Sequence, residues 1–128
     1  MSGTPVGRIT GAALLGGIVG NPVSHSLSPV IHNAWLEAGG VDGAYVAFAP
    51  KDAAGFEALV AAGRAGLIAG VNVTAPFKEQ AFALADEAAA AAQMTGSANI
   101  LVFEDGRVRA DSADGAGVLY ALAEQAPK

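Results

Sequence analysis

Short apolar runs alternate along the chain with segments whose apolar residues recur at helical spacing. Apolar or alternating runs of about four to eight residues are typical of strands, and apolar residues every three to four positions are typical of helices. This pattern predicts strands at residues 12–19, 43–49, 67–73, 98–103 and 107–110. It predicts helices at residues 29–38, 53–64, 76–92 and 114–124, with Asp86 as a candidate break in the third.

Strands and helices that alternate through short connections predict an α/β fold. We expect a three-layer αβα domain with a mostly parallel, mixed sheet that helices cover on both faces. An Asp-Gly turn joins the last two strands and predicts one antiparallel hairpin. Ser28 followed by Pro29 predicts the N-cap and the first position of a helix, and Trp35 and Tyr45 are expected in the core.

The composition narrows the class of protein. A length of 128 residues, 52% of them hydrophobic, fits one domain with a substantial core. The absence of cysteine excludes disulfides, thiol catalysis and cysteine-ligated metals. The net charge of -5 argues against nucleic acid or an anionic membrane surface as a partner. No apolar run reaches about 18 residues and no signal-peptide pattern occurs, so we expect a cytoplasmic protein.

Polar residues gather where the predicted strands would end at one edge of the sheet. They occupy residues 21–28, 72–78 and 111–114, and Ser97 and Asn99 stand at the start of the fourth strand. In open α/β sheets, ligands bind at the carboxyl ends of the strands. The sequence therefore predicts one ligand site that these segments share.

The first of these segments combines serine hydroxyls with the start of a helix. Ser26 and Ser28 are the two serines nearest that start. Hydroxyls and the backbone N–H groups of a helix N-terminus can bind a carboxylate without an arginine. The same serines would also serve as a helix cap and a solvated loop. The loop alone leaves both interpretations open.

The second and third segments carry candidate acid–base chemistry. Asn72 and Thr74 are two positions apart and face the same way on an extended chain. Lys78 falls in the first turn of the predicted third helix, where a cation opposes the helix dipole by about 0.3–1 kcal/mol. Asp114, brought beside Lys78, would form a pair able to carry the proton of a secondary alcohol as hydride leaves carbon. A solvated lysine and a helix-capping aspartate are the structural alternatives.

The sequence assigns no cofactor-binding residue and predicts no metal site. The only Gly-x-Gly pattern, at residues 115–117, lacks the third glycine of a dinucleotide loop, and no phosphate-binding loop motif occurs. His25 and His32 have no neighbour at metal-ligand spacing. Any nucleotide would therefore have to be held by residues outside this sequence.

Four motifs, in this order, resemble the substrate-binding domain of shikimate dehydrogenases. They are Gly-Asn-Pro-x-x-His-Ser-Leu-Ser-Pro-x-Ile-His-Asn at 20–33, Asn-Val-Thr-x-Pro-Phe-Lys at 72–78, Ser-Ala-Asn at 97–99 and Asp-x-x-Asp-Gly-x-Gly at 111–117. The resemblance runs from about residue 15 to residue 123. The chain departs from the family pattern at Ile100, Ser112 and Ala113.

The resemblance implies a role for each candidate residue. Ser26 and Ser28 look like the carboxylate-binding serines. Lys78 looks like the catalytic lysine, paired with Asp114. The remaining substrate-binding residues, which would hold the ring hydroxyls together with Asp114, are Asn72, Thr74 and Asn99. The reaction implied is the NADP-dependent, reversible reduction of 3-dehydroshikimate to shikimate, on the route to chorismate and the aromatic amino acids.

The resemblance also implies a partner domain. Residues 1–128 would form the substrate-binding domain, and a Rossmann-type domain that binds NADP would follow residue 128. The chain alone should then bind shikimate or 3-dehydroshikimate without turnover, as a monomer or a homodimer. Two alternatives stay open: a quinate/shikimate dehydrogenase that uses NAD, and a non-catalytic module that senses quinate or shikimate.

Overall fold

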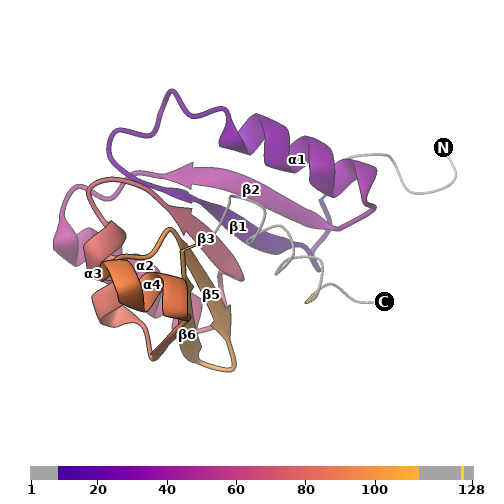
Figure 1. Cartoon of the computed structure of the whole chain (residues 1–128). Coiled ribbons are helices and arrows are strands. Elements are labelled where there is room, and N and C mark those ends of the chain that lie inside the picture. Colours follow the sequence, from indigo (N-terminus) through magenta and orange to yellow (C-terminus); the bar gives the residue numbers. More distant parts are fainter. Residues whose placement is uncertain (1–8, 113–124, 126–128) are drawn as a thin grey trace, which may run out of the picture.

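The computed structural model describes residues 9–112 and Gln125 (Figure 1). Its strands are β1 Leu14–Val19, β2 Gly43–Phe48, β3 Gly70–Val73, β4 Glu87–Ala88, β5 Ile100–Glu104 and β6 Arg107–Asp111. Its helices are α1 Ser28–Ala38, α2 Ala53–Arg64, α3 Lys78–Leu84 and α4 Ala90–Thr95. The helix predicted at 114–124 lies outside the described residues. No helix in the described part of the chain is long and apolar enough to cross a membrane.

The strands form one mixed sheet in the order β2-β1-β3-β5-β6-β4. β1 runs parallel to both β2 and β3, and β4 runs parallel to β6. β5 runs antiparallel to β3 and to β6. The predicted mixed, mostly parallel sheet and the β5–β6 hairpin are confirmed. Some strand ends coincide with the predicted ends and the others differ by up to three residues, as at β3, which begins at Gly70.

Helices cover both faces of the sheet, so the predicted three layers are confirmed. α1 lies on one face, and α2, α3 and α4 lie on the other (Figure 1). Successive side chains of β5 point to opposite faces of the sheet, so this strand contributes to the hydrophobic core on each face. Leu101 and Phe103 belong to the larger cluster with Phe56 of α2, whereas Ile100 and Val102 belong to the smaller cluster, which α1 covers.

The prediction of one helix over residues 76–92 is wrong in the middle of that range. The chain instead forms α3, the short strand β4 and then α4. The Asp86 backbone N–H donates to the Val108 carbonyl at 2.8 Å, and the Ala89 N–H donates to the Ala110 carbonyl at 3.0 Å. Pairing with β6 thus replaces helical hydrogen bonds. The alanine-rich composition favoured a helix, but this tertiary contact decides the structure.

Two predictions about α1 are also wrong. Ser28 is the first residue of α1, and the N-cap position is taken by Leu27. The Trp35 side chain lies on the outer surface with 48% exposure. Its ring makes a tilted contact with the His32 ring at a centroid distance of 5.2 Å. Helical spacing alone did not distinguish the buried stripe, to which His32 belongs, from the neighbouring exposed positions.

The Asp86 carboxylate connects the segment before β4 to α2 and to β6 through hydrogen bonds. Its Oδ2 accepts hydrogen bonds from Arg64 Nη1 at 2.6 Å and from the Val108 backbone N–H at 2.7 Å. Arg64 also donates to the carbonyls of Leu84 and Gly106. The hydrogen bond from Arg64, followed by that from Val108, holds the pKa of the Asp86 carboxyl below its usual value.

This lowered pKa predicts an acid-sensitive contribution to stability. Because the folded-state pKa lies below the unfolded value of about 3.9, the contribution is present above that value and is lost as pH falls through the folded pKa. We expect Asp86→Asn to be less stable than wild type at neutral pH, with the difference shrinking below about pH 4. Urea unfolding of both proteins at a series of pH values measures this difference in the free energy of unfolding. Asp105→Asn, in the exposed β5–β6 turn, is the control, and a constant Asp86→Asn deficit at every pH would contradict the prediction.

Candidate functional site

The predicted polar segments meet at one edge of the sheet. β1, β2 and β3 run parallel and end there, and the antiparallel β5 begins there. Asn72 of β3 is the register partner of Ile100. The Val73 N–H donates to the Asn99 carbonyl at 2.8 Å, and the Asn99 N–H donates to the Asp111 carbonyl at 3.0 Å. The edge therefore gathers side chains from segments that are far apart in sequence.

The loops that leave β1 and β3 are tied to each other. The Thr74 N–H donates to the Val19 carbonyl at 2.8 Å, and the Asn21 N–H donates to the Ala75 carbonyl at 3.1 Å. A Cβ on Gly20 would lie 2.3 Å from Thr74 Cγ2. Only glycine permits this approach, so Gly20 helps to fix where the half-buried Thr74 side chain lies.

Both candidate serines lie at the start of α1. Ser26 Oγ accepts a hydrogen bond from the Ser28 backbone N–H at 3.1 Å. Ser26 therefore accepts from the backbone N–H of the first residue of α1, one of the N–H groups that have no partner within the helix. Both side chains are half-buried. The arrangement concentrates hydroxyls and N–H groups at the positive end of the helix dipole, which suits an anion.

Asn72 has a partner that the sequence did not assign to the site. The Tyr45 hydroxyl of β2 donates to Asn72 Oδ1 at 2.7 Å. Tyr45 is 1% exposed, so its predicted place in the core is confirmed, but its hydroxyl belongs to the polar edge. Burial raises the pKa of Tyr45 well above its usual value, and a hydrogen bond with the Ser28 side chain partly opposes that rise. The sequence did offer a signal for this contact, because a tyrosine expected in the core needs a hydrogen-bond partner for its hydroxyl.

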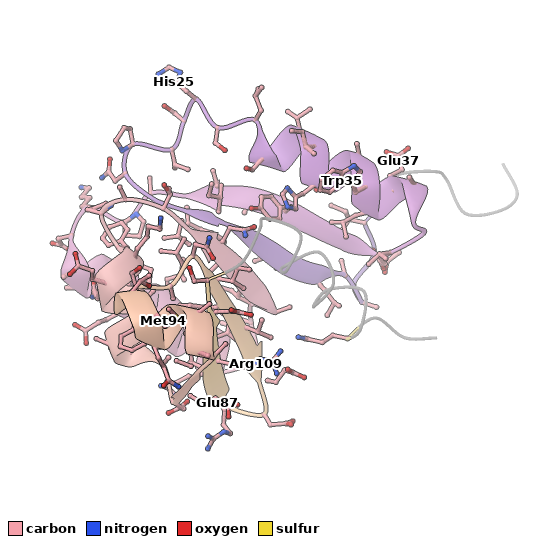
Figure 2. All side chains as sticks on the ribbon, viewed as in Figure 1. His25, Trp35, Glu37, Glu87, Met94 and Arg109 are labelled. Carbon is pink, nitrogen blue, oxygen red and sulfur yellow. The ribbon has the colours of Figure 1, made fainter. Side chains whose placement is uncertain are left out.

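Lys78 is the first residue of α3 and its side chain is exposed. Its carbonyl accepts a hydrogen bond from the Ala98 N–H at 2.9 Å, which places Lys78 beside the segment that carries Asn99. Asp114, its predicted partner, lies outside the described residues. His25 is exposed and projects from the outer bend of the β1–α1 loop, away from the sheet (Figure 2).

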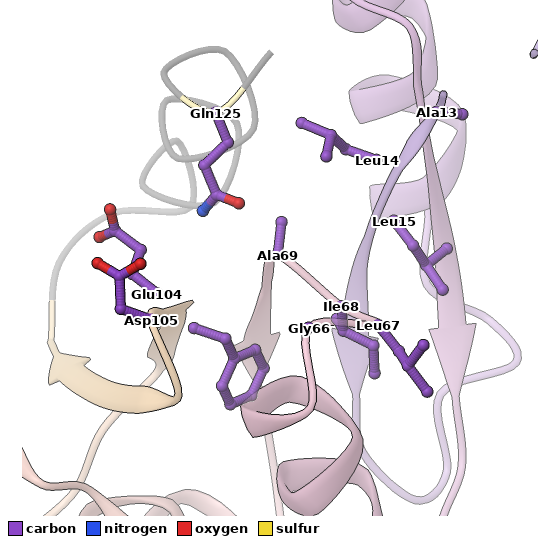
Figure 3. A pocket seen from close by; sticks show the side chains of 11 residues that line it. Ala13, Leu14, Leu15, Gly66, Leu67, Ile68, Ala69, Glu104, Asp105 and Gln125 are labelled. Atoms are coloured by element: carbon purple, nitrogen blue, oxygen red, sulfur yellow. The ribbon is translucent and has the colours of Figure 1, made fainter. Parts of the chain in front are cut away.

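A cavity of about 280 Å³ lies at the opposite end of the sheet (Figure 3). Its walls come from the start of β1, the segment before β3 and the β5–β6 turn, with Glu104, Asp105 and Gln125 among the lining residues. It takes no part in the polar edge. Among the described residues, no group of three or more His, Asp or Glu side chains could hold a metal ion.

The fold and the polar edge define a class: an α/β domain whose polar side chains gather at the ends of its strands, where open α/β sheets bind ligands. A sequence model of the shikimate dehydrogenase substrate-binding domain matches residues 18–101. The chain belongs to this family.

Relatives and solved structures agree with the match. The chain is 58% identical over 120 residues to a protein of Caulobacter vibrioides named shikimate dehydrogenase (NADP(+)), covering 93% of this chain and 42% of that protein. It is 44% identical to the protein of that name from Maricaulis maris, covering 89% of this chain and 40% of that protein. The chain thus spans less than half the length of these relatives.

Among solved structures, the chain superposes on shikimate 5-dehydrogenase of Listeria monocytogenes, determined with shikimate and NAD. The TM-score is 0.78 at 36% identity, over 91% of this chain and 40% of that chain. A shikimate dehydrogenase structure in complex with NADP+ gives a TM-score of 0.79 at 33% identity, over 96% of this chain and 42% of that one.

Proposed function

We propose that the chain is the substrate-binding part of an NADP-dependent shikimate dehydrogenase, which interconverts 3-dehydroshikimate and shikimate. The observation that carries this proposal is the convergence of the motif segments at one edge of the sheet. Asn72, Thr74, Asn99 and Lys78 arise from strand and helix ends that hydrogen bonds tie together, and the serines of the β1–α1 segment complete the set. A substrate with one carboxylate and several ring hydroxyls matches this set of groups.

The carboxylate would bind at the start of α1. Ser26 and Ser28 offer hydroxyl donors there, and the helix dipole favours a negative charge at the same position. This arrangement binds an anion with neutral groups. It leaves Lys78, an exposed cation at this edge, for chemistry at the other end of the substrate.

The ring hydroxyls would meet Asn72, Thr74 and Asn99. Two of these residues are fixed by the sheet: Asn72 lies within β3, and Asn99 is held between the backbones of Val73 and Asp111. Thr74 follows β3 directly and packs against Gly20. Groups fixed in this way hold a ligand at a small conformational cost. Asp114, which we include in this set, lies outside the described residues.

Lys78 would carry the proton. As hydride adds to the carbonyl carbon of 3-dehydroshikimate, negative charge develops on the oxygen, and a lysine ammonium can donate a proton to it. In the reverse direction, the neutral amine accepts the hydroxyl proton as hydride leaves carbon. The position of Lys78 at the tip of α3, next to the Ala98–Asn99 segment, suits this role.

NADP, where bound, would be the hydride donor or acceptor, and the described residues do not fit it. The loop after β1 has none of the Gly-x-Gly-x-x-Gly spacing that lets a backbone approach a pyrophosphate. The described polar edge instead presents serine, asparagine and threonine side chains. We therefore place NADP on a domain outside residues 1–128, which would extend the chain toward the length of its relatives.

Thermal melting of the chain with and without millimolar shikimate tests the proposal. A ligand at about 100 times its Kd stabilises by roughly 2.7 kcal/mol, which raises the melting temperature of a domain of this size by several degrees. Thr74→Val, which removes one hydroxyl at constant shape, should reduce the shift. Quinate serves as the comparison ligand.

Three results would count against the proposal. Absence of shikimate-dependent reduction of NADP+ by the full-length protein would overturn the assigned reaction. Steady NADPH production by residues 1–128 alone would overturn the placement of the cofactor on another domain. A melting shift with quinate but none with shikimate would assign the site to the other ligand.

A further inference from the structure

A polar connection runs from α1 through β2 to Asn72. Tyr45 lies in β2 at the edge of the sheet, whereas Asn72 lies in β3, two strands away. In the register of the sheet, Tyr45 is partnered by Gly16 of β1, and Gly16 is partnered by Gly70 of β3. Tyr45 is therefore the only residue of this row across the three strands that carries a side chain. Its ring can cross β1, and the hydroxyl reaches Asn72 Oδ1 at 2.7 Å.

Two residues of α1 hold Tyr45 in place. The His32 ring stacks on the Tyr45 ring with a centroid distance of 4.1 Å and an interplanar angle of 12°. Asn33 Oδ1 accepts from the Tyr45 backbone N–H at 2.9 Å, and Asn33 Nδ2 donates to the Tyr45 carbonyl at 2.8 Å. The backbone and the ring of Tyr45 are thus both fixed to the helix that carries Ser28.

The hydrogen bond from Tyr45 also sets the orientation of the Asn72 amide. The buried hydroxyl stays protonated, because burial raises the pKa of Tyr45. As a donor, it requires the oxygen end of the amide to face it, so the nitrogen end faces away. Within the part of the chain that the structure describes, Asn72 Nδ2 makes no hydrogen bond. Two N–H donors are therefore ready for an oxygen atom of a ligand.

We propose that Tyr45 is a positioning residue for substrate binding: it holds Asn72 Oδ1, so that Asn72 Nδ2 presents donors to a hydroxyl or carbonyl oxygen of the substrate. This inference rests on the proposed function and adds a residue to it. Tyr45 acts through Asn72 and does not itself touch the substrate. His32 and Asn33 support the same arrangement from α1.

The test is Tyr45→Phe in the full-length protein, because phenylalanine keeps the ring that stacks on His32 and removes only the hydroxyl. We expect the KM and the Kd for shikimate to rise about three- to tenfold, which is the effect of losing one well-placed hydrogen bond. We expect kcat to change less than about twofold, because the binding lost is common to substrate and transition state. Val108→Ala, a core variant in β6, controls for destabilisation: it should lower the melting temperature and leave KM unchanged.

A double-mutant cycle separates positioning through Asn72 from a general effect on the fold. In an Asn72→Ala background, Tyr45→Phe should add no further change in KM. An unchanged KM in Tyr45→Phe overturns the inference while leaving the proposed function intact. An equal rise in KM with and without Asn72 also overturns it, because Tyr45 would then act by another route. A wild-type protein that neither binds nor turns over shikimate overturns both the inference and the proposed function.

Discussion

Replacing Lys78 with methionine should lower shikimate turnover by the full-length protein at least about 100-fold while leaving shikimate binding within a few fold. Proton transfer by a positioned side chain contributes about 10²–10⁴-fold to a rate, and methionine keeps the length of the side chain without the amine. Lys78 is exposed at the first position of α3, so its loss opens no cavity. The measurements are kcat from the rate of NADPH formation and Kd from ligand titration.

Lys51→Met is the matched control for this variant. Lys51 is also an exposed lysine, and it follows β2 at the same edge of the sheet. Its replacement changes the net charge by the same amount, so it removes any general electrostatic attraction of the anionic substrate equally. Turnover by Lys78→Met that stays within about tenfold of the Lys51→Met rate would remove Lys78 from the proton-transfer step. It would favour the binding-module alternative.

The second large effect concerns stability. Phe56→Ala should lower the free energy of unfolding by about 3–5 kcal/mol, the usual cost of truncating a buried aromatic residue to alanine. Phe56 is fully buried in α2, and its ring stacks on Phe77 at a centroid distance of 5.0 Å and an angle of 8°. Since domains are stable by only about 5–15 kcal/mol, this loss should bring the chain close to unfolding. Urea unfolding of the purified chain measures it.

Phe56→Leu separates the loss of volume from the loss of the ring contact. Leucine refills most of the cavity, so this variant should lose clearly less stability than Phe56→Ala. Phe77 occupies the N-cap position immediately before Lys78, so the stack also supports the position of α3 at the site. A loss of less than about 1 kcal/mol in Phe56→Ala would contradict the prediction, and would mean that the surrounding core closes around the cavity at little cost.

The sequence predicted the fold class, the layers and the meeting of the polar segments at one edge. These features follow from periodicities that each segment carries by itself, such as the alternation of β5 between two cores. The order of the strands, in contrast, was not predicted. β5 enters between β3 and β6 in the antiparallel sense, so Asn99 reaches the edge from the start of a strand rather than from its end.

The error at residues 76–92 and the missed Tyr45–Asn72 contact arose where one tertiary contact outweighs local preference. The alanines around residue 90 favour a helix, but pairing with β6 makes Glu87–Ala88 a strand. The Tyr45–Asn72 contact also escaped prediction, because it joins two strands separated by β1 and depends on the glycines in the row between them. The roles of the candidate site residues stay predictions that the experiments above address.

The position of β3 in the interior of the sheet affects how much conformational entropy the protein loses when a ligand binds. β3 lies between β1 and β5 and is hydrogen-bonded on both sides, and its Val71 and Val73 are buried. Opening the backbone at Asn72 therefore requires two ladders to separate, so we expect its amide hydrogens to exchange with solvent through rare openings. A ligand that binds Asn72 orders little backbone there. Most of the conformational entropy lost on binding would therefore come from the ligand and from the exposed loop that carries Ser26.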